Sequence, residues 1–296
     1  MTNSILVPAE RNWRLALPRV LPWLLTGVAF ILLFGKPMTL LARDWWTDPE
    51  SGHGLLLAPA AVWLAVKRGS ATGARGQPWL GVAVLVLAVV LRLAGELAAE
   101  LFTMRFALVV ALVGLTVFYQ GRRQVMAWWL PFTLLALAIP LPELIRSAIA
   151  LPLQFKASAL GAALLESRHV PVQLAGNIIQ LPGHRLFVSE ACSGLRSLTA
   201  LLSIAVLMGG LWFKQPVMRI MLVALAIPIA VVINGLRVFL TGFLVYFVDP
   251  KFGEGFLHLS EGWLLFVVSF GLLAGTAVAV APLDRWMARR AAINHD

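Results

Sequence analysis

The sequence predicts an all-α polytopic membrane protein, on the evidence of its composition and the length of its apolar runs. Of its 296 residues, 60% are hydrophobic and only 13% are charged, and the mean hydropathy is +0.86. A water-soluble domain of this composition would expose large apolar patches to water. Most of the apolar runs approach the roughly 20 residues that a helix needs to cross about 30 Å of hydrocarbon. We therefore expect a single integral membrane domain over residues 1–296.

The positions of the apolar runs predict eight membrane-spanning helices. The first run follows Arg11, Arg14 and Arg19 without a convincing cleavage site after it, so we expect a retained helix and not a removed signal peptide. The second run is the shortest of the set. The expected spans are 20–41, 53–66, 79–97, 100–119, 125–142, 193–213, 219–247 and 258–281.

The loops between these runs alternate between basic and acidic. Because cytoplasmic loops of membrane proteins carry an excess of Lys and Arg, the alternation predicts that both termini are cytoplasmic, which agrees with an even number of spans. The net charge of +10 then follows from this bias, since no basic patch interleaved with aromatic residues suggests nucleic-acid binding. The basic loops contain Arg11, Arg14, Arg19, Lys67, Arg68, Arg75, Arg122, Arg123, Lys214, Arg219, Arg285, Arg289 and Arg290.

The segment 143–191 interrupts the series of spans and is expected on the outer face. Its first half has polar residues at intervals that suit an interfacial helix. Its second half, 169–183, reads as short strands joined by turns. Such strands cannot face lipid, because their backbone groups would lack hydrogen-bond partners. We therefore expect an interfacial helix followed by a small β-type cap.

Four chemically distinctive residues are expected near the outer ends of four different spans: Cys192, Arg237, His258 and His53. At 1.5 Å per residue, Cys192 lies about 33 Å and Arg237 about 27 Å from the cytoplasmic end of its helix. Each residue alone has an ordinary structural explanation: a buried packing thiol, an arginine reaching the headgroups, or a histidine that caps a helix. Their arrival in one layer from separate helices instead favours an active site.

The chemistry of these residue types suits acyl transfer from a peptide bond through a thioester. A helix N-terminus and the nearby Arg196 favour the thiolate form of Cys192. A histidine can return a proton to the leaving amine, and a guanidinium can stabilise the oxyanion. The only cysteine is not accompanied by a recognisable set of metal ligands, and no phosphate-binding glycine loop occurs. We expect neither a metal nor a cofactor.

Four local motifs resemble those of the exosortase/archaeosortase family of membrane transpeptidases. The upstream motif differs from the family pattern by one inserted residue, Gly52, between serine and histidine. The resemblance extends from about residue 20 to 281. The motifs are Glu190-Ala191-Cys192-Ser193-Gly194-Leu195-Arg196-Ser197-Leu198, Asn234-Gly235-Leu236-Arg237, His258-Leu259-Ser260-Glu261-Gly262 and Ser51-Gly52-His53-Gly54-Leu55-Leu56-Leu57-Ala58-Pro59.

The resemblance implies that Cys192 is the nucleophile, Arg237 the oxyanion-stabilising or substrate-orienting cation, and His258 the proton shuttle. It also implies a substrate whose C-terminal tail carries a Pro-Glu-Pro-like motif, a hydrophobic helix and a basic cluster. Such tails are typical of Gram-negative bacteria with exopolysaccharide, which implies an inner-membrane enzyme whose active site faces the periplasm. The expected supporting or substrate-binding residues are His53, Arg196, Asn234, Glu190, Ser193, Gly194 and Glu261.

Two other classes of protein are compatible with the sequence. Cys192 could serve a membrane acyltransferase that does not cleave peptides. Alternatively, Arg237 and the histidines could line a polar pathway in a transporter or an assembly scaffold. The acceptor of the acyl group, the identity of the base (His258 or His53) and the oligomeric state stay open.

Overall fold

The structure, a computed structural model, describes residues 13–188, 194–253 and 255–293. Helices dominate the described residues, and a three-stranded antiparallel sheet of order β1-β2-β3 accompanies them. The elements in chain order are α1 (Trp13–Thr47), α2 (Gly54–Arg68), α3 (Pro78–Leu97), α4 (Leu101–Gln120), α5 (Arg122–Ala127), α6 (Trp129–Leu137), α7 (Glu143–Glu166), β1 (Gln173–Ala175), β2 (Ile178–Leu181), β3 (His184–Phe187), α8 (Leu195–Trp212), α9 (Pro216–Phe247), η2 (Pro250–Gly253) and α10 (Gly255–Ile293).

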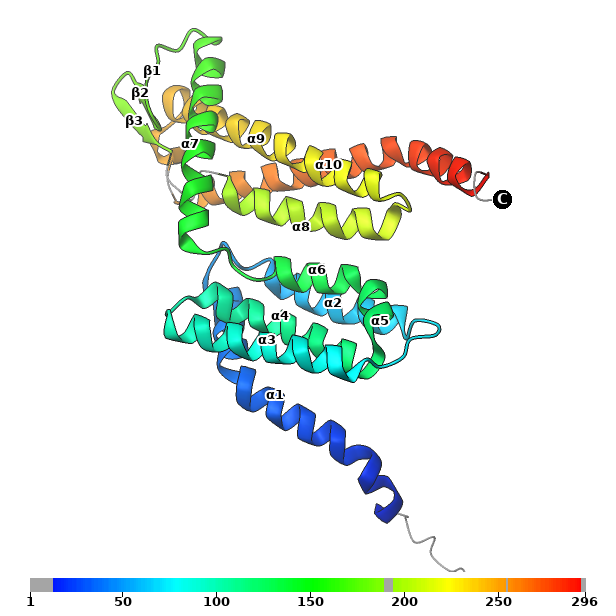
Figure 1. Ribbon diagram of the computed structural model, residues 1–296. Helices are drawn as coiled ribbons and strands as arrows, with labels where there is room; N and C mark the ends of the chain where they lie inside the picture. Colours follow the sequence, from blue (N-terminus) through cyan, green and yellow to red (C-terminus); the bar gives the residue numbers. More distant parts are fainter. Residues whose placement is uncertain (1–12, 189–193, 254, 294–296) are drawn as a thin grey trace, which may run out of the picture.

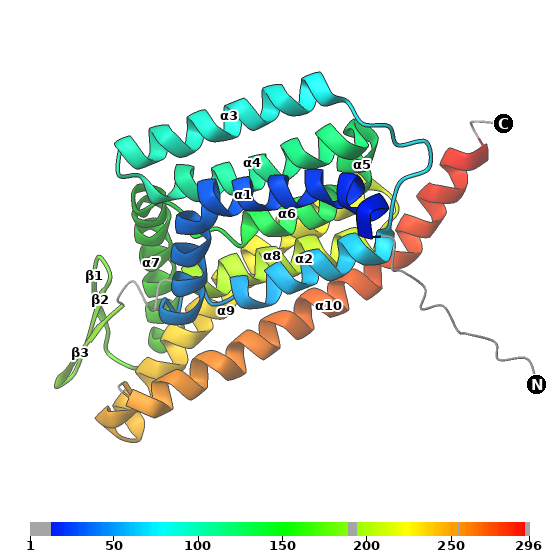
Figure 2. The same ribbon diagram turned by 90° about the horizontal axis from the view of Figure 1, so that it is seen from below.

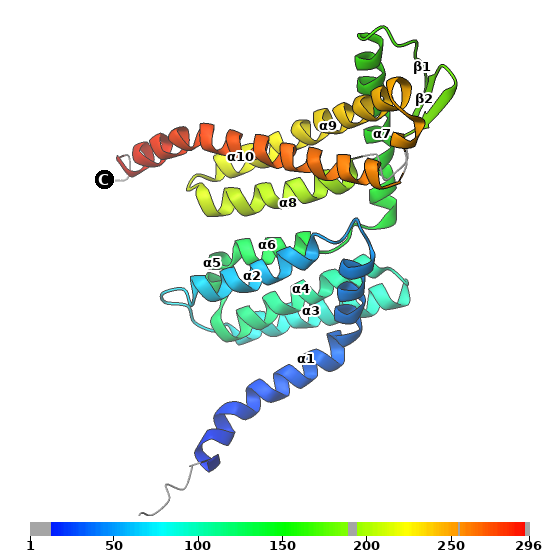
Figure 3. The ribbon, with the colours of Figure 1, turned by 180° about the vertical axis from the view of Figure 1, so that it is seen from behind.

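The helices form two groups that run along a common direction. Figure 1 shows α1 to α6 in one group and α8 to α10 in the other, and the reverse view in Figure 3 agrees. Helix α7 runs across the end of the α8–α10 group, and the sheet lies beside it at the same end. Figure 2 shows α7 nearly end-on. We call this end of the molecule the cap end. The opposite end carries Arg68, Arg75, Arg122, Arg123 and Arg219, and we call it the basic end.

Seven of the described helices are long and apolar enough to cross a membrane: α1, α3, α4, α7, α8, α9 and α10. Helix α7 satisfies this criterion of length and composition, but its direction across the bundle suits an interfacial helix. The expected spans at 53–66 and 125–142 correspond to shorter helices that run with the bundle. These are the 15-residue α2 and the pair α5–α6, which is interrupted at Trp128. The expectation of an all-α polytopic membrane protein with an interfacial helix and a small β cap is confirmed.

Several helices are longer than their apolar runs. Helix α1 continues to Thr47, six residues beyond the expected end, and its acidic Asp44 forms an ion pair with Arg105 of α4. The Arg105 side chain is only 6% exposed, so the pair is largely removed from solvent. Pairing of this kind lets charged residues stay in an otherwise apolar layer. Helix α9 begins at Pro216, where the missing N–H and fixed φ of proline fit the first turn.

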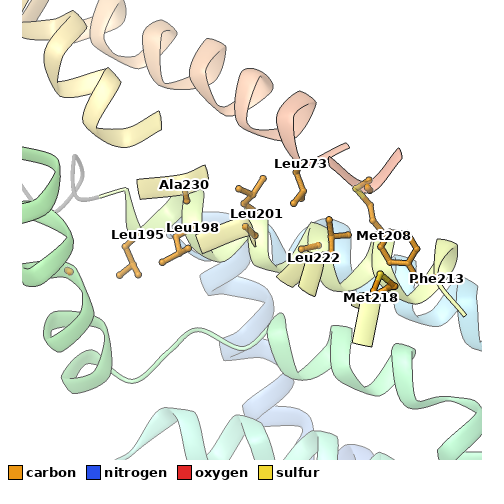
Figure 4. Close-up of a cluster of buried hydrophobic side chains, with 13 residues drawn as sticks. Leu195, Leu198, Leu201, Met208, Phe213, Met218, Leu222, Ala230 and Leu273 are labelled. Atoms are coloured by element: carbon orange, nitrogen blue, oxygen red, sulfur yellow. The ribbon is translucent and has the colours of Figure 1, made fainter. Parts of the chain in front are cut away.

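The largest buried cluster joins α8, α9 and α10. Figure 4 shows Leu195 and Leu198 of α8 at one end of it, Leu201 and Leu273 further along, and Met208, Phe213 and Met218 at the other end. Leu201, Leu222 and Leu273 are fully buried. In contrast, many apolar side chains on the outside of the bundle are exposed, as expected of helices that face lipid. The cluster fixes the relative positions of the three helices that carry the candidate site.

The sheet is attached to α7 by a polar contact. Asn177, in the turn between β1 and β2, donates through Nδ2 to Oε1 of Gln154 at 3.0 Å and to the carbonyl of Val188 at 3.2 Å. The backbone N–H of Val188 donates in turn to the carbonyl of Asn177 at 2.9 Å. Gln154 is 7% exposed. The chain is therefore held firmly at Val188, just before the segment that contains Cys192.

Candidate active site

Helix α8 begins against the side chain of Asn234 on α9. Its N-cap residue, Gly194, has φ = +81° and ψ = +4°, a left-handed conformation that glycine adopts without the steric cost of a Cβ. A methyl group at Gly194 would lie 2.6 Å from Cγ and 2.9 Å from Nδ2 of Asn234. Glycine thus meets two demands here, a positive φ and a close approach.

Arg237 lies one turn beyond Asn234 and extends to α10. A methyl group at Gly262 would lie 3.2 Å from Nη2 and 3.3 Å from Cζ of Arg237, so the guanidinium rests on the α10 backbone. Positions 258 and 262 are separated by four residues and share one face of α10. The backbone at His258 therefore lies one turn away from the guanidinium contact, towards the helix start. Three helices meet at this point: α8 through Gly194, α9 through Asn234 and Arg237, and α10 through Gly262.

Helix α7 crosses α9 beside these residues. Gly235, which follows Asn234, lies so close to Leu160 of α7 that a methyl group at position 235 would overlap the leucine side chain. A small crevice opens at the crossing, and its lining includes Leu153 of α7 together with Gly194 and Asn234. The interfacial helix thus forms one wall of the candidate site. The motif residue Gly235 serves this packing.

His53 is held by hydrogen bonds within the other group of helices, α1 to α6. Its Nδ1 lies 3.1 Å from the carbonyl oxygen of Glu50, and its Nε2 lies 3.1 Å from the carbonyl oxygen of Leu137 at the end of α6. Both ring nitrogens face backbone acceptors, so the imidazole ties the start of α2 to the end of α6. The neighbouring Ser51 is buried and donates to Oδ2 of Asp48 at 2.5 Å. This arrangement suits a structural role for His53 in joining α2 to α6.

Charged residues also gather at the cap end. Arg146 of α7 pairs with Glu50 at 3.0 Å and with Glu143. Glu100 caps α4 by accepting from the backbone N–H groups of Phe102 at 2.9 Å and Thr103 at 2.6 Å. Burial alone would raise the pKa of Glu100, but these bonds and the charge of Arg105 outweigh it, so that pKa lies below its usual value.

Among the described side chains, no three of His, Cys, Asp or Glu could together hold a metal ion.

The expected site residues fall into four sets. Gly194, Asn234 and Arg237 come together, Arg196 is exposed on the first turn of α8, and His53 is bonded within the α2–α6 group. Glu190, Cys192 and Ser193 lie outside the described residues, as do the side chains of His258 and Glu261 on α10.

Sequence reasoning did not identify Gln154 as the residue that anchors the sheet. The only signal for this role was that Gln154 is a polar residue on a largely apolar face of its helix.

Comparison with known proteins identifies the family. The family model described as transmembrane exosortase matches residues 45–275, which include all four motifs. No curated protein and no solved structure matches the chain. Because the family match extends over most of the 296 residues, this protein belongs to the transmembrane exosortases, a family of membrane transpeptidases and proteases that act on substrates with sorting signals.

Proposed function

We propose that this protein is a cysteine transpeptidase that cleaves C-terminal sorting tails at the cap end of its helix bundle. Cys192 is the nucleophile, Arg237 stabilises the oxyanion or orients the scissile carbonyl, and His258 carries the proton. Asn234 and Gly194 position the nucleophile segment against α9. His53 is assigned a supporting role, since both of its ring nitrogens face backbone carbonyl oxygens.

The observation that supports the proposal most directly is the series of close approaches from α8 to α10. Gly194 contacts Asn234, Arg237 follows one turn later, and its guanidinium rests on Gly262. The two motif segments that flank this series contain Cys192 and His258. Groups that act on one bond must come within hydrogen-bond reach of it. The close approaches of Gly194 to Asn234 and of Gly262 to Arg237 support this by joining segments that are distant in sequence.

The reaction then proceeds in two stages. The Cys192 thiolate attacks the scissile carbonyl carbon, and the negative charge that develops on its oxygen is stabilised by the guanidinium of Arg237. The C–N bond breaks as His258 gives a proton to the departing amine, which leaves a thioester on Cys192. An acceptor nucleophile attacks the thioester carbonyl, gives up its proton to the histidine and releases the thiolate.

The substrate that this arrangement suits is a protein tail with a Pro-Glu-Pro-like motif, a hydrophobic helix and a basic cluster. A tail inserted with its basic cluster on the same side of the membrane as the basic end would present its motif at the cap end. The glutamate of the motif can pair with Arg196, which is exposed on the first turn of α8. By the positive-inside rule, the basic end is cytoplasmic and the cap end faces the periplasm of a Gram-negative inner membrane.

The test is cleavage of a periplasmic reporter that carries such a tail, co-expressed with the protein in cells. We expect a shortened reporter with the wild type and none with Cys192→Ser, Arg237→Gln or His258→Gln. His169→Gln is a matched control, because His169 is exposed and lies before the cap strands. Cleavage that persists in Cys192→Ser would refute the mechanism.

A second comparison tests the pairing of the substrate glutamate with Arg196. A reporter with Pro-Gln-Pro should be cleaved more slowly by the wild type, and Arg196→Gln should remove most of that difference. Full discrimination between the two reporters by Arg196→Gln would assign the recognition of the glutamate to another residue.

A further inference from the structure

A second hollow lies at the basic end, far from the candidate active site. It has a volume of about 370 Å³ and is lined by Gly73, Arg75, Gln77, Arg122 and Arg123. This volume falls within the roughly 300–1,000 Å³ that is usual for small-molecule sites. Three of the five lining residues are arginines, and they come from the α2–α3 loop and the start of α5. Figure 1 shows that loop and α5 side by side at one end of the molecule.

The loop that supplies half of this hollow is held in place by hydrogen bonds. Gln124, which is fully buried, accepts from the backbone N–H of Ala71 at 2.6 Å and donates to the carbonyl of Gly69 at 2.9 Å. The indole N–H of Trp128 donates to the same carbonyl of Gly69 at 3.1 Å. The backbone N–H of Gln77 donates to the carbonyl of Val117 on α4 at 3.0 Å. The hollow is therefore a formed feature of the fold.

The two segments that line the hollow are packed closely against each other. A methyl group at Gly73 would lie 3.1 Å from Nη1 of Arg123, so this guanidinium is packed on the loop. On the other side, a side chain at Gly121 would overlap the carbonyl oxygen of Arg75. The backbone N–H of Arg122 faces Oε1 of Gln77 at 3.4 Å. Two segments separated by about 45 residues thus present their cations to one space.

Among the described residues, the lining of the hollow contains no carboxylate. Between residues 67 and 127, the acidic residues are Glu96 and Glu100, and both lie at the cap end of α3 and α4. The ion pairs among the described residues do not include Arg75, Arg122 or Arg123. Clustered guanidinium groups repel one another, so an anion bound between them would reduce this electrostatic repulsion.

The hollow adjoins the start of α3, a helix long and apolar enough to cross a membrane. Pro78 begins α3 immediately after Gln77, and the next residue, Trp79, is 88% exposed. Exposed tryptophan beside the end of a membrane-spanning helix is typical of the headgroup region. Basic pockets between helices at that level bind the phosphate groups of anionic lipids. A basic substrate tail would be repelled from the same position.

We propose that the hollow formed by Arg75, Arg122 and Arg123 is a binding site for the phosphate group of an anionic phospholipid from the adjoining leaflet. The guanidinium forks of Arg122 and Arg123 bind the phosphate oxygens, and Gln77 supports the turn between them. The site needs no residue of the candidate active site, so its test is independent of catalysis.

Native mass spectrometry of the purified full-length protein in detergent provides the test. We expect dioleoyl phosphatidylglycerol to stay bound and dioleoyl phosphatidylcholine to bind much more weakly. The double variant Arg122→Gln/Arg123→Gln should bind phosphatidylglycerol at least about 10-fold more weakly, because it loses two guanidinium groups that make charge-assisted hydrogen bonds to the phosphate. The melting temperature without lipid shows whether each variant is folded.

A matched control separates a defined site from general attraction. Arg285→Gln/Arg289→Gln removes the same charge from exposed positions near the end of α10 and should leave the affinity for phosphatidylglycerol nearly unchanged. An equal loss in this control would overturn the proposal, because the attraction would then be diffuse. A third arm uses inorganic phosphate at millimolar concentration. If it displaces the lipid and stabilises the protein as strongly, the site is one for soluble phosphate and the lipid assignment is wrong.

Discussion

Replacement of Gly194 by alanine would test whether the start of α8 is as tightly constrained as its geometry indicates. The new methyl group would lie 2.6 Å from Cγ of Asn234, and the backbone would still need φ = +81°. A left-handed conformation costs an L-residue about 1–2 kcal/mol. Overpacking in a close contact adds about 1–3 kcal/mol. We therefore expect a loss of about 2–5 kcal/mol in the free energy of unfolding.

The expected effect on activity is larger than a loss of stability alone would cause. To relieve the overlap, either Asn234 or the first turn of α8 must move, and the segment that contains Cys192 moves with that turn. A displacement of about 1 Å at a reacting group can lower the rate about 100-fold. Cleavage of the sorting-tail reporter by Gly194→Ala should fall by at least about 10-fold under conditions in which the protein remains folded.

Two other glycines separate the contributions to this effect. Gly183 has φ = +77° with no atom within 4 Å of an added methyl group, so Gly183→Ala measures backbone strain without a clash. Gly275, in the middle of α10, has neither a positive φ nor an atom within 4 Å of an added methyl group. Gly275→Ala therefore serves as the neutral control. Melting temperature and reporter cleavage are measured for all three variants. If Gly194→Ala behaves like Gly183→Ala in both assays, the contact with Asn234 has no functional role and the reasoning is refuted.

Three further predictions concern other parts of the molecule. Gly262→Leu should push the guanidinium of Arg237 off α10 and lower reporter cleavage at least about 10-fold under conditions in which the melting temperature shows that the protein is folded. Gln154→Leu should remove the acceptor of Asn177 and lower the melting temperature, since a buried unsatisfied donor costs about 1–3 kcal/mol. Glu100→Ala should destabilise α4 by about 1 kcal/mol. Because the pKa of Glu100 is lowered in the folded state, its contribution is present above the unfolded pKa and is lost as the pH falls through the folded value. A wild-type melting temperature with the same acid dependence as Glu100→Ala would contradict this.

The sequence predicted the fold class because membrane insertion leaves strong marks on composition. Runs of about 20 apolar residues, an alternation of basic loops and polar residues spaced along 144–166 predicted the helices and the interfacial α7. The run at 53–66 became a short α2, and 125–142 became a helix broken at Trp128. Helix lengths were harder to predict, because ion pairs such as Asp44–Arg105 extend helices past their apolar limits.

The sequence predicted which motifs contribute to the candidate site but not which contacts their residues make. The positions of Asn234 and Arg237 followed from counting residues along α9. The packing of Arg237 on Gly262 depends on the angle between α9 and α10, which no local pattern encodes. Equally, the two carbonyl partners of His53 come from α6 and from the preceding loop. Long-range backbone contacts of this kind have no signature in a single sequence.

The passage of the chain through residues 138–142, from α1–α6 to α7–α10, has a consequence for biosynthesis. The ribosome delivers the first helix group to the membrane before any part of residues 194–262 has been made. Helices α8 and α9 follow, and α10 is made after them. Until α10 packs against Arg237, the proposed catalytic set is incomplete. The proposed activity would therefore begin only after α10 has been made and has packed against α9.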